Sequence, residues 1–197
     1  MSIKLTTLVA VCLFIACATV QSRILRTGKG KGLWGGKTFQ DSLENELMDY
    51  SVGGCPDAKE ALKLHNQLRR KHGAEKLRWD DKLAQDAQAW AENNAANGVM
   101  AHSTEEQRNF QGENLAFLWV GLPELENTAA QEGTKMWIEE EPLYPVDPMQ
   151  ALHFTQMVWK KTTNIGIGCA KSGDMVYVCA RYNPRGNFES FTENVQM

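Results

Sequence analysis

The chain has 197 residues, of which 43% are hydrophobic and 23% charged, with 21 basic and 24 acidic side chains. This length suits one domain with a substantial buried core plus a terminal extension. The formal net charge of −3 argues against nucleic acid as a partner, because domains that bind nucleic acid carry a basic surface.

Residues 1–22 have the pattern of a secretory signal peptide. Lys4 precedes an apolar stretch over residues 5–16, and small residues follow. The stretch is shorter than a membrane helix needs and is soon followed by Arg23, although an uncleaved anchor is an alternative. Cleavage takes away Lys4 and no acid, which leaves 20 basic against 24 acidic side chains and a formal charge of −4. We therefore predict a secreted, extracellular protein.

Residues 23–54 are glycine-rich and basic at first, then acidic, with little sustained periodicity. This composition predicts a flexible N-terminal segment of the mature chain, or a pro-segment. Lys29, Lys31 and Lys37 form a small basic cluster, for which we weigh contact with anionic lipid head groups against simple solvation. Contact with a membrane surface is therefore one partner hypothesis.

The remaining region, residues 55–197, is assigned to one compact domain with four helices. Pro56 suits the first turn of the first helix, and Gly73 is a natural stop for it. Apolar residues recur at helical spacing in each of the four segments. The predicted helices span residues 56–72, 80–97, 124–140 and 153–161.

Strands are predicted at residues 164–170 and 175–182, and the Ser-Gly turn signal between them favours a hairpin. A further strand is expected between His102 and Leu118. Helices and antiparallel strands without a repeating strand-helix-strand order indicate the α+β class, with a sheet covered by helices.

Five cysteines become three when Cys12 and Cys17 leave with the signal peptide. Cys169 and Cys179 lie in the two strands of the predicted hairpin, and we expect them to form a disulfide, which secretion permits. Cys55 is then left over. It either has no chemical role or forms an intermolecular disulfide that links two chains in a dimer.

Two histidines and two glutamates are the candidate site residues: His102, Glu113, Glu140 and His153. Glu113 lies in the apolar run GENLAFLW, an unusual place for a charge unless it is paired or functional. Imidazole nitrogens bind divalent metals, and carboxylates coordinate the metal or orient the rings. The same groups can act as acid and base around a bound water. No His-Glu-x-x-His or Cys-x-x-Cys motif is present, so spacing alone does not choose between these hypotheses and structural roles.

Several separated stretches resemble the CAP superfamily, which comprises cysteine-rich secretory, antigen 5 and pathogenesis-related proteins. The resemblance covers about residues 57–190. The stretches are HNQLRRKHGAEKLRWDDKLAQDAQAWA at 65–91, GENLA at 112–116, HFTQMVWKKTTNIGIGCA at 153–170 and VYVCARYNPRGNF at 176–188. The last stretch resembles the Golgi-associated plant pathogenesis-related type in particular.

The resemblance implies an α-β-α sandwich with a central, mostly antiparallel sheet. It also implies a groove in which His102 and His153 hold zinc or another divalent cation, with Glu113 and Glu140 as further binding residues. Several family members bind sterols or fatty acids. Here the apolar loop at residues 141–152 would either make such contacts or pack on the domain as a lid.

Residues and resemblance together predict a secreted binding module for a sterol or another lipid, with an accessory divalent-metal site. The alternative is a secreted ligand in defence, venom or reproduction that acts on an unknown protein receptor through its surface. A metal-dependent hydrolase ranks third. Ser103, beside His102, is the nearest candidate nucleophile, and it fits a turn residue better.

Overall fold

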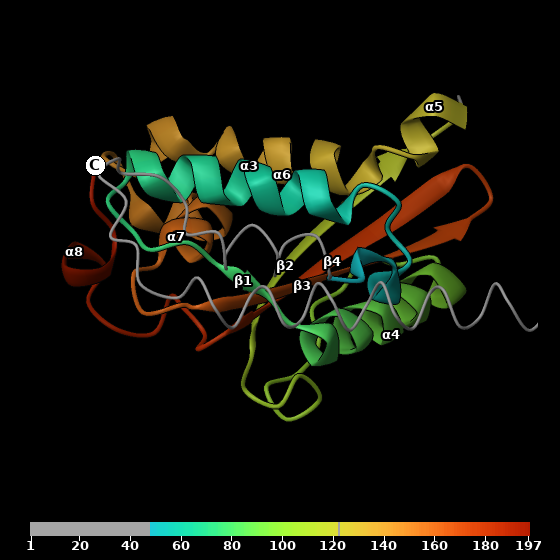
Figure 1. The fold of residues 1–197 in the computed structure, drawn as a ribbon, viewed down its shortest axis with the longest axis horizontal. Coiled ribbons are helices and arrows are strands. Elements are labelled where there is room, and N and C mark those ends of the chain that lie inside the picture. Colours follow the sequence, from blue (N-terminus) through green and yellow to red (C-terminus); the bar gives the residue numbers. More distant parts are fainter. Residues whose placement is uncertain (1–47, 122) are drawn as a thin grey trace, which may run out of the picture. The chain divides into compact units, whose positions relative to one another are not determined.

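The computed structural model describes residues 48–121 and 123–197 (Figure 1). The predicted signal peptide and most of the predicted flexible segment, with its lysine cluster, lie outside the described residues. Within the described part of the chain, no helix is long and apolar enough to cross a membrane.

A four-stranded sheet lies at the centre of this domain. Its strands, in spatial order, are β1 (Arg78–Trp79), β3 (Asn164–Ser172), β4 (Met175–Asn183) and β2 (Gly112–Trp119). β3 and β4 form the predicted hairpin, and β2 pairs antiparallel with β4. Only β1, which is too short to show the alternation that predicts a strand, runs parallel to its neighbour. The expected α+β fold with a mostly antiparallel sheet is confirmed.

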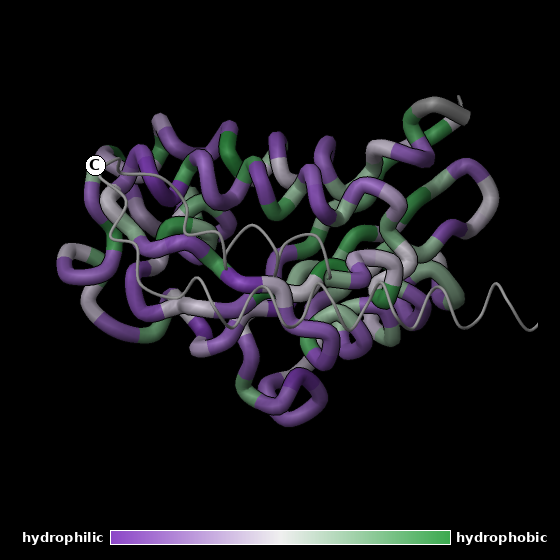
Figure 2. Tube along the Cα trace, in the orientation of Figure 1, coloured by the Kyte–Doolittle hydropathy of each residue, from purple (hydrophilic) through white to green (hydrophobic). Residues whose placement is uncertain are grey.

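Helices cover both faces of the sheet (Figure 1). One face carries α3 (Ala58–Lys71), α6 (Ala129–Ile138) and α7 (Leu152–Val158), and the other carries α4 (Asp81–Asn97). Hydrophobic residues recur along α3 and α6 and occupy much of the central strands (Figure 2). Two short helices, α5 (Pro123–Glu126) and α8 (Phe191–Asn194), and three 3-10 helices complete the described elements. This arrangement is the expected α-β-α sandwich.

Glycines in β3 allow α4 to approach the sheet closely. A Cβ atom on Gly166 would lie 2.0 Å from the backbone nitrogen of Ala84, and one on Gly168 would lie 2.2 Å from that of Gln88. Any side chain at these positions would push the helix away from the strand. The two glycines of NIGIGCA therefore serve the packing of α4 on the sheet.

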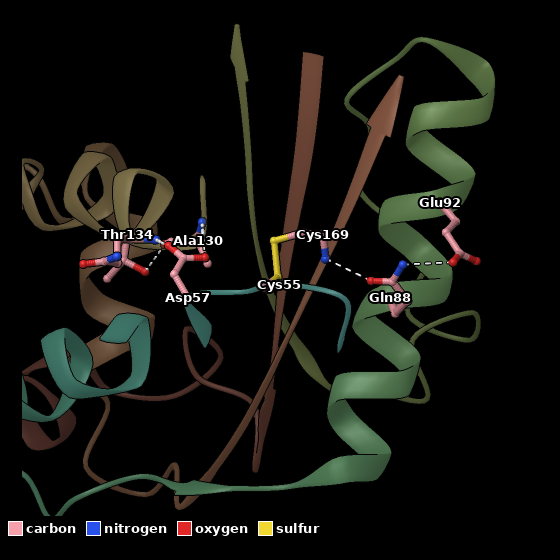
Figure 3. Close-up of a disulfide and its surroundings, with 8 residues drawn as sticks. Cys55, Asp57, Gln88, Glu92, Ala130, Thr134 and Cys169 are labelled. Atoms are coloured by element: carbon pink, nitrogen blue, oxygen red, sulfur yellow. Dashed lines mark hydrogen bonds between the residues drawn. A yellow bond between two sulfur atoms is a disulfide. The ribbon is translucent and has the colours of Figure 1, made fainter. Parts of the chain in front are cut away.

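The helix predicted at residues 124–140 is in fact two helices, α5 and α6, with a break between them. At the start of α6, the backbone N–H groups of Ala130 and Gln131 donate to the carboxylate of Asp57 at 3.3 and 2.7 Å. Asp57 lies far away in the sequence but points at the first turn of α6 (Figure 3). This long-range N-cap fixes where α6 begins.

The helix predicted at residues 153–161 ends earlier, at Val158. A buried arginine donates hydrogen bonds to carbonyl groups at and after this helix end. Arg69 donates to the carbonyl oxygens of Met157, Trp159 and Thr162 at 2.9, 2.9 and 2.8 Å. Burial lowers the pKa of Arg69 to about 10, so its side chain stays charged at neutral pH. The partial negative charge at the end of α7 favours that cation.

The disulfide joins Cys55 to Cys169 (Figure 3), so the predicted Cys169–Cys179 pairing is wrong. In the hairpin register, Cys169 lies opposite Val178 and Cys179 opposite Gly168. This one-residue offset directs the two cysteine side chains to opposite faces of the sheet. Cys179 is instead free and buried. Because Cys55 is used within the chain, it has no thiol for the intermolecular disulfide that we considered.

The folded region begins slightly before Cys55, the start that we predicted. A 3-10 helix spans Tyr50–Gly53, and the Tyr50 ring packs on that of Trp79 with a centroid distance of 5.2 Å. The disulfide at Cys55 ties this segment to β3. The glycine-rich composition of residues 23–54 therefore did not predict this short ordered element at the end of the segment.

Candidate functional site

The first histidine–glutamate pair lies at the beginning of β2. Nδ1 of His102, in the loop before the strand, is 2.6 Å from Oε1 of Glu113. The His102 side chain is 58% exposed, whereas that of Glu113 is only 2% exposed. An exposed imidazole is thus held by a buried carboxylate.

Glu113 is further fixed by two neighbours. The backbone N–H and the hydroxyl of Ser103 donate to its carboxylate at 3.1 and 2.7 Å, and Nη1 of the equally buried Arg181 lies 2.9 Å from Oε2. Burial alone would raise the pKa of Glu113, but the hydrogen bond from His102 and the charge of Arg181 outweigh burial, and the pKa is lowered. Glu113 is therefore an ionised hydrogen-bond acceptor at neutral pH.

Ser103 has a structural role in this pair. Its hydroxyl donates to Glu113 and accepts a hydrogen bond from Nη1 of Arg181 at 3.0 Å, and the residue is 3% exposed. A nucleophile has to be accessible and activated by a base. The hydroxyl of Ser103 is buried and fully engaged, so the geometry does not favour it as a nucleophile.

The second pair joins Glu140 and His153. Nδ1 of His153 is 2.6 Å from Oε1 of Glu140, and the other carboxylate oxygen accepts the N–H groups of His153 and Phe154 at 2.9 and 3.2 Å. Glu140 lies just after α6, not within a helix as predicted. Its carboxylate therefore also caps the first turn of α7, where a negative charge is favourable.

Residues from α6 and β2 fix the position of His153. The Trp137 ring stacks on the His153 ring at 6.2 Å and 24°, and its Nε1 donates to the carbonyl of Leu115 at 3.0 Å. The side-chain amide of Asn114 donates to the carbonyl of His153 at 3.1 Å. The imidazole is thus held through both its ring and its backbone.

The structure brings the four predicted residues together as two pairs. Glu113 and Asn114 are consecutive in β2, so their side chains lie on opposite faces of this edge strand. Glu113 pairs with Arg181 and His102, whereas Asn114 contacts His153. Among the described residues, no group of three or more His, Cys, Asp or Glu side chains is arranged to hold a metal ion.

The donor chemistry of each pair nevertheless fits a divalent cation. Both histidines use Nδ1 for a carboxylate, which leaves Nε2 as the nitrogen for a ligand. A carboxylate on the far nitrogen is the usual partner of a metal-binding imidazole, because it fixes the tautomer and the ring orientation. In this arrangement Glu113 and Glu140 orient the rings, while His102 and His153 would supply the ligand atoms.

Sequence reasoning missed Arg181 and Asn114. Arg181 is 2% exposed and lies in the apolar run VYVCARY. A charge within a buried strand is the signal that identified Glu113, so the same argument identifies Arg181. Asn114 carries no comparable signal, because its contact with His153 depends on how α7 meets β2.

Comparison with known proteins gives consistent results. The model of the cysteine-rich secretory protein family, CAP, matches residues 62–182, which is more than half of the chain. Golgi-associated plant pathogenesis-related protein 1 of Homo sapiens is 37% identical over 144 residues, covering 69% of this chain and 90% of that protein. The secreted protein PRY1 of Candida albicans is 34% identical, covering 66% of this chain and 30% of that protein. The solved structure of BmVAL-1 is 27% identical, with a TM-score of 0.57 over 72% of this chain and 81% of that one.

Proposed function

The chain belongs to the cysteine-rich secretory protein (CAP) family, and from this premise we propose that it is a secreted module that binds a sterol or another lipid. We further propose that His102 and His153 hold a divalent metal ion. Relatives such as PRY1 are secreted proteins. The observation that carries the lipid proposal is the exposure of apolar side chains in residues 141–152.

This segment, which we call the apolar loop, leads into α7 and ends at Leu152, the first residue of that helix. Leu143, Val146 and Met149 are 41%, 83% and 64% exposed. Tyr144, in contrast, packs on the Phe154 ring of α7 with a centroid distance of 6.0 Å. One aromatic side chain thus anchors the apolar loop while three apolar side chains face outward. Exposed apolar groups gathered on one surface segment are typical of interaction sites.

Replacement of two apolar loop residues is expected to weaken lipid binding. Burying one Val or Met side chain contributes about 1.5–3 kcal/mol, so the double variant Val146→Ser, Met149→Ser should bind radiolabelled cholesterol or palmitate at least about tenfold more weakly than the unchanged protein. Both side chains are exposed, so the fold should be unaffected. Saturable binding by the purified protein is the measurement.

The matched control is Val99→Ser, because Val99 is 55% exposed and follows α4, in the other helical layer. This variant should bind the lipid as the unchanged protein does. Absence of saturable binding of either lipid to the unchanged protein overturns the lipid proposal. Equal loss in the control would show that general surface hydrophobicity, rather than the apolar loop, is responsible.

Zinc affinity is expected to depend on the two carboxylates as well as on the two histidines. A bound cation would supply a Lewis acid and a structural cross-link. Because loss of a carboxylate partner typically costs 10–100-fold in metal affinity, Glu140→Gln should weaken zinc binding by about that factor. Alanine at His102 or His153 should weaken it further. Titration calorimetry near neutral pH measures each value.

Glu139→Gln provides a matched control. Glu139 is the exposed neighbour of Glu140, and its replacement removes the same charge. Its zinc affinity should be unchanged. If the unchanged protein does not bind zinc, the metal proposal fails and the lipid proposal stands or falls on its own measurement.

A further inference from the structure

A pocket of about 420 Å³ lies between α4 and the loop that precedes β2. Its walls come from α4, from residues 107–109 and Gln111 of the loop, and from Arg181 of β4. His102 and His153 do not line it, and neither does the apolar loop. The loop before β2 is predominantly hydrophilic (Figure 2). The pocket is therefore distinct from the apolar loop and from the two histidines, and it adjoins the proposed metal site only through Arg181, which pairs with Glu113.

Four side-chain amides and one aromatic ring line these walls, beside four charged side chains. The half-exposed Trp90 supplies the ring, and its Nε1 donates to the carbonyl of Ala101 at 2.9 Å, which fixes the ring orientation. Each amide offers both donors and an acceptor. The amides belong to Asn93, Gln107, Asn109 and Gln111. A flat apolar wall edged by amides suits a ligand that has C–H faces and hydroxyl edges.

Two buried polar atoms at this pocket have no hydrogen-bond partner among the described residues. They are Oε1 of Gln111 and Nε of Arg181, and the two residues are 7% and 2% exposed. The Gln111 amide cannot be reversed at no cost, because its Nε2 donates to Oδ2 of Asp86 at 2.8 Å. One atom lacks a donor and the other lacks an acceptor, which is unfavourable for both. A hydroxyl group provides both functions.

The surrounding charges favour an uncharged ligand. Each of the three basic residues that line the pocket has an acidic partner: Lys82 is paired with Asp86, Arg108 with Glu105 and Arg181 with Glu113. A carboxylate or a fully ionised phosphate ester would accept a hydrogen bond from Arg181, but it would bring no proton for Oε1 of Gln111. It would also lie close to the carboxylate of Asp86. A neutral hydroxyl-bearing molecule avoids both problems.

The turn at residues 107–111 contributes several of the lining residues, Gln111 among them. Asn109 and Phe110 have φ values of 50° and 56°, in the left-handed region that Asn tolerates and that is unfavourable for a bulky residue such as Phe. Arg108, which precedes Asn109, donates to the carbonyl of Ser103. Strained backbone of this kind recurs at sites that clamp ligands. Because both unpaired atoms are buried, a ligand reaches them only when the pocket wall moves.

We propose that this pocket binds a saccharide residue or a similar uncharged polyol. The sugar ring stacks on Trp90, and its hydroxyl groups bond to Oε1 of Gln111 and Nε of Arg181. The flanking amides of Asn93 and Gln107 select among sugars by the positions of the remaining hydroxyl groups.

The test uses the complete chain with its disulfide formed, and four neutral sugars: glucose, mannose, galactose and N-acetylglucosamine, together with myo-inositol. Saturation-transfer NMR and titration calorimetry report binding, and inorganic phosphate is the anionic probe. The test variant is Ala89→Trp, because Ala89 is an exposed residue of α4 that lines the pocket. The larger side chain should fill the pocket without removing a hydrogen bond. Ala96→Trp, at an exposed position of the same helix outside the pocket, is the matched control.

We expect at least one neutral probe to bind saturably, Ala89→Trp to weaken that binding at least about tenfold, and Ala96→Trp to change it less than about twofold. Asn93→Ala, at an exposed residue, should weaken it as well without disturbing the fold. The proposal is overturned if no neutral probe binds, if only phosphate binds, or if both tryptophan variants bind alike. If water alone bonds to the two unpaired atoms, no neutral probe will bind.

Discussion

Loss of the Cys55–Cys169 disulfide is expected to lower the free energy of unfolding by about 4 kcal/mol. The two cysteines are separated by 114 positions in the sequence. A cross-link that closes so long a loop removes much conformational entropy from the unfolded chain. It also ties the 3-10 helix at Tyr50–Gly53 to β3. Chemical denaturation of the double variant Cys55→Ala, Cys169→Ala, compared with the unchanged protein, measures the effect.

Cys179→Ala is the informative control, because Cys179 is a buried cysteine outside any disulfide. Burial raises the pKa of its thiol far above the ordinary value, so it should react slowly with alkylating reagents in the folded protein. Its replacement removes one buried atom and should cost about 1 kcal/mol. A larger loss for Cys179→Ala than for the double variant would contradict the disulfide pairing, as would a Cys169–Cys179 peptide in a non-reducing digest.

The disulfide was predicted wrongly because the sequence analysis did not work out the register of the hairpin. The Ser-Gly signal between the two strands correctly predicted the hairpin, because turn chemistry is local. The pairing of Cys169 with Cys179, however, depended on register. A two-residue turn places Ser172 opposite Met175 and therefore Cys169 opposite Val178. Counting from the turn would have placed the two cysteines on opposite faces and left Cys55 as the available partner.

Other features could not be predicted from local patterns. Helical periodicity located α3 and α4 within a few residues, because each buries one continuous stripe. The start of α6 depends instead on Asp57, and the end of α7 depends on Arg69. Both partners are distant in sequence and meet these helices only after the fold has formed. Likewise, His153 and Glu140 were predicted as candidate site residues from their side-chain chemistry and from the family resemblance, whereas their direct hydrogen bond requires the chain reversal between α6 and α7.

Removal of Arg181 alone is expected to destabilise the protein by about 3–5 kcal/mol. Arg181 and Glu113 are each 2% exposed, with 2.9 Å between Nη1 and Oε2. Arg181→Met leaves a buried carboxylate without its compensating charge, and His102 with Ser103 cannot replace that charge fully. The double variant Arg181→Met, Glu113→Leu should recover most of the loss, because an apolar pair of similar volume incurs no ionic desolvation. Denaturation of the unchanged protein, of Arg181→Met, of Glu113→Leu and of the double variant at neutral pH gives the coupling free energy.

The pH dependence of the same variants identifies the charge as the cause. The pKa of Glu113 in the folded protein lies below its ordinary value of 4.5, so its pairing stabilises the protein at neutral pH, and this contribution is lost as pH falls through 4.5 towards the folded value. In Arg181→Met, the positive charge that helps to lower the pKa of Glu113 against burial is gone, so that pKa should rise. Acid should therefore destabilise this variant less than the unchanged protein. Unfolding free energies measured between about pH 7 and 3 should therefore converge at the acid end. Parallel curves for the two proteins would instead mean that Arg181 stabilises the fold by packing, with no electrostatic link to Glu113.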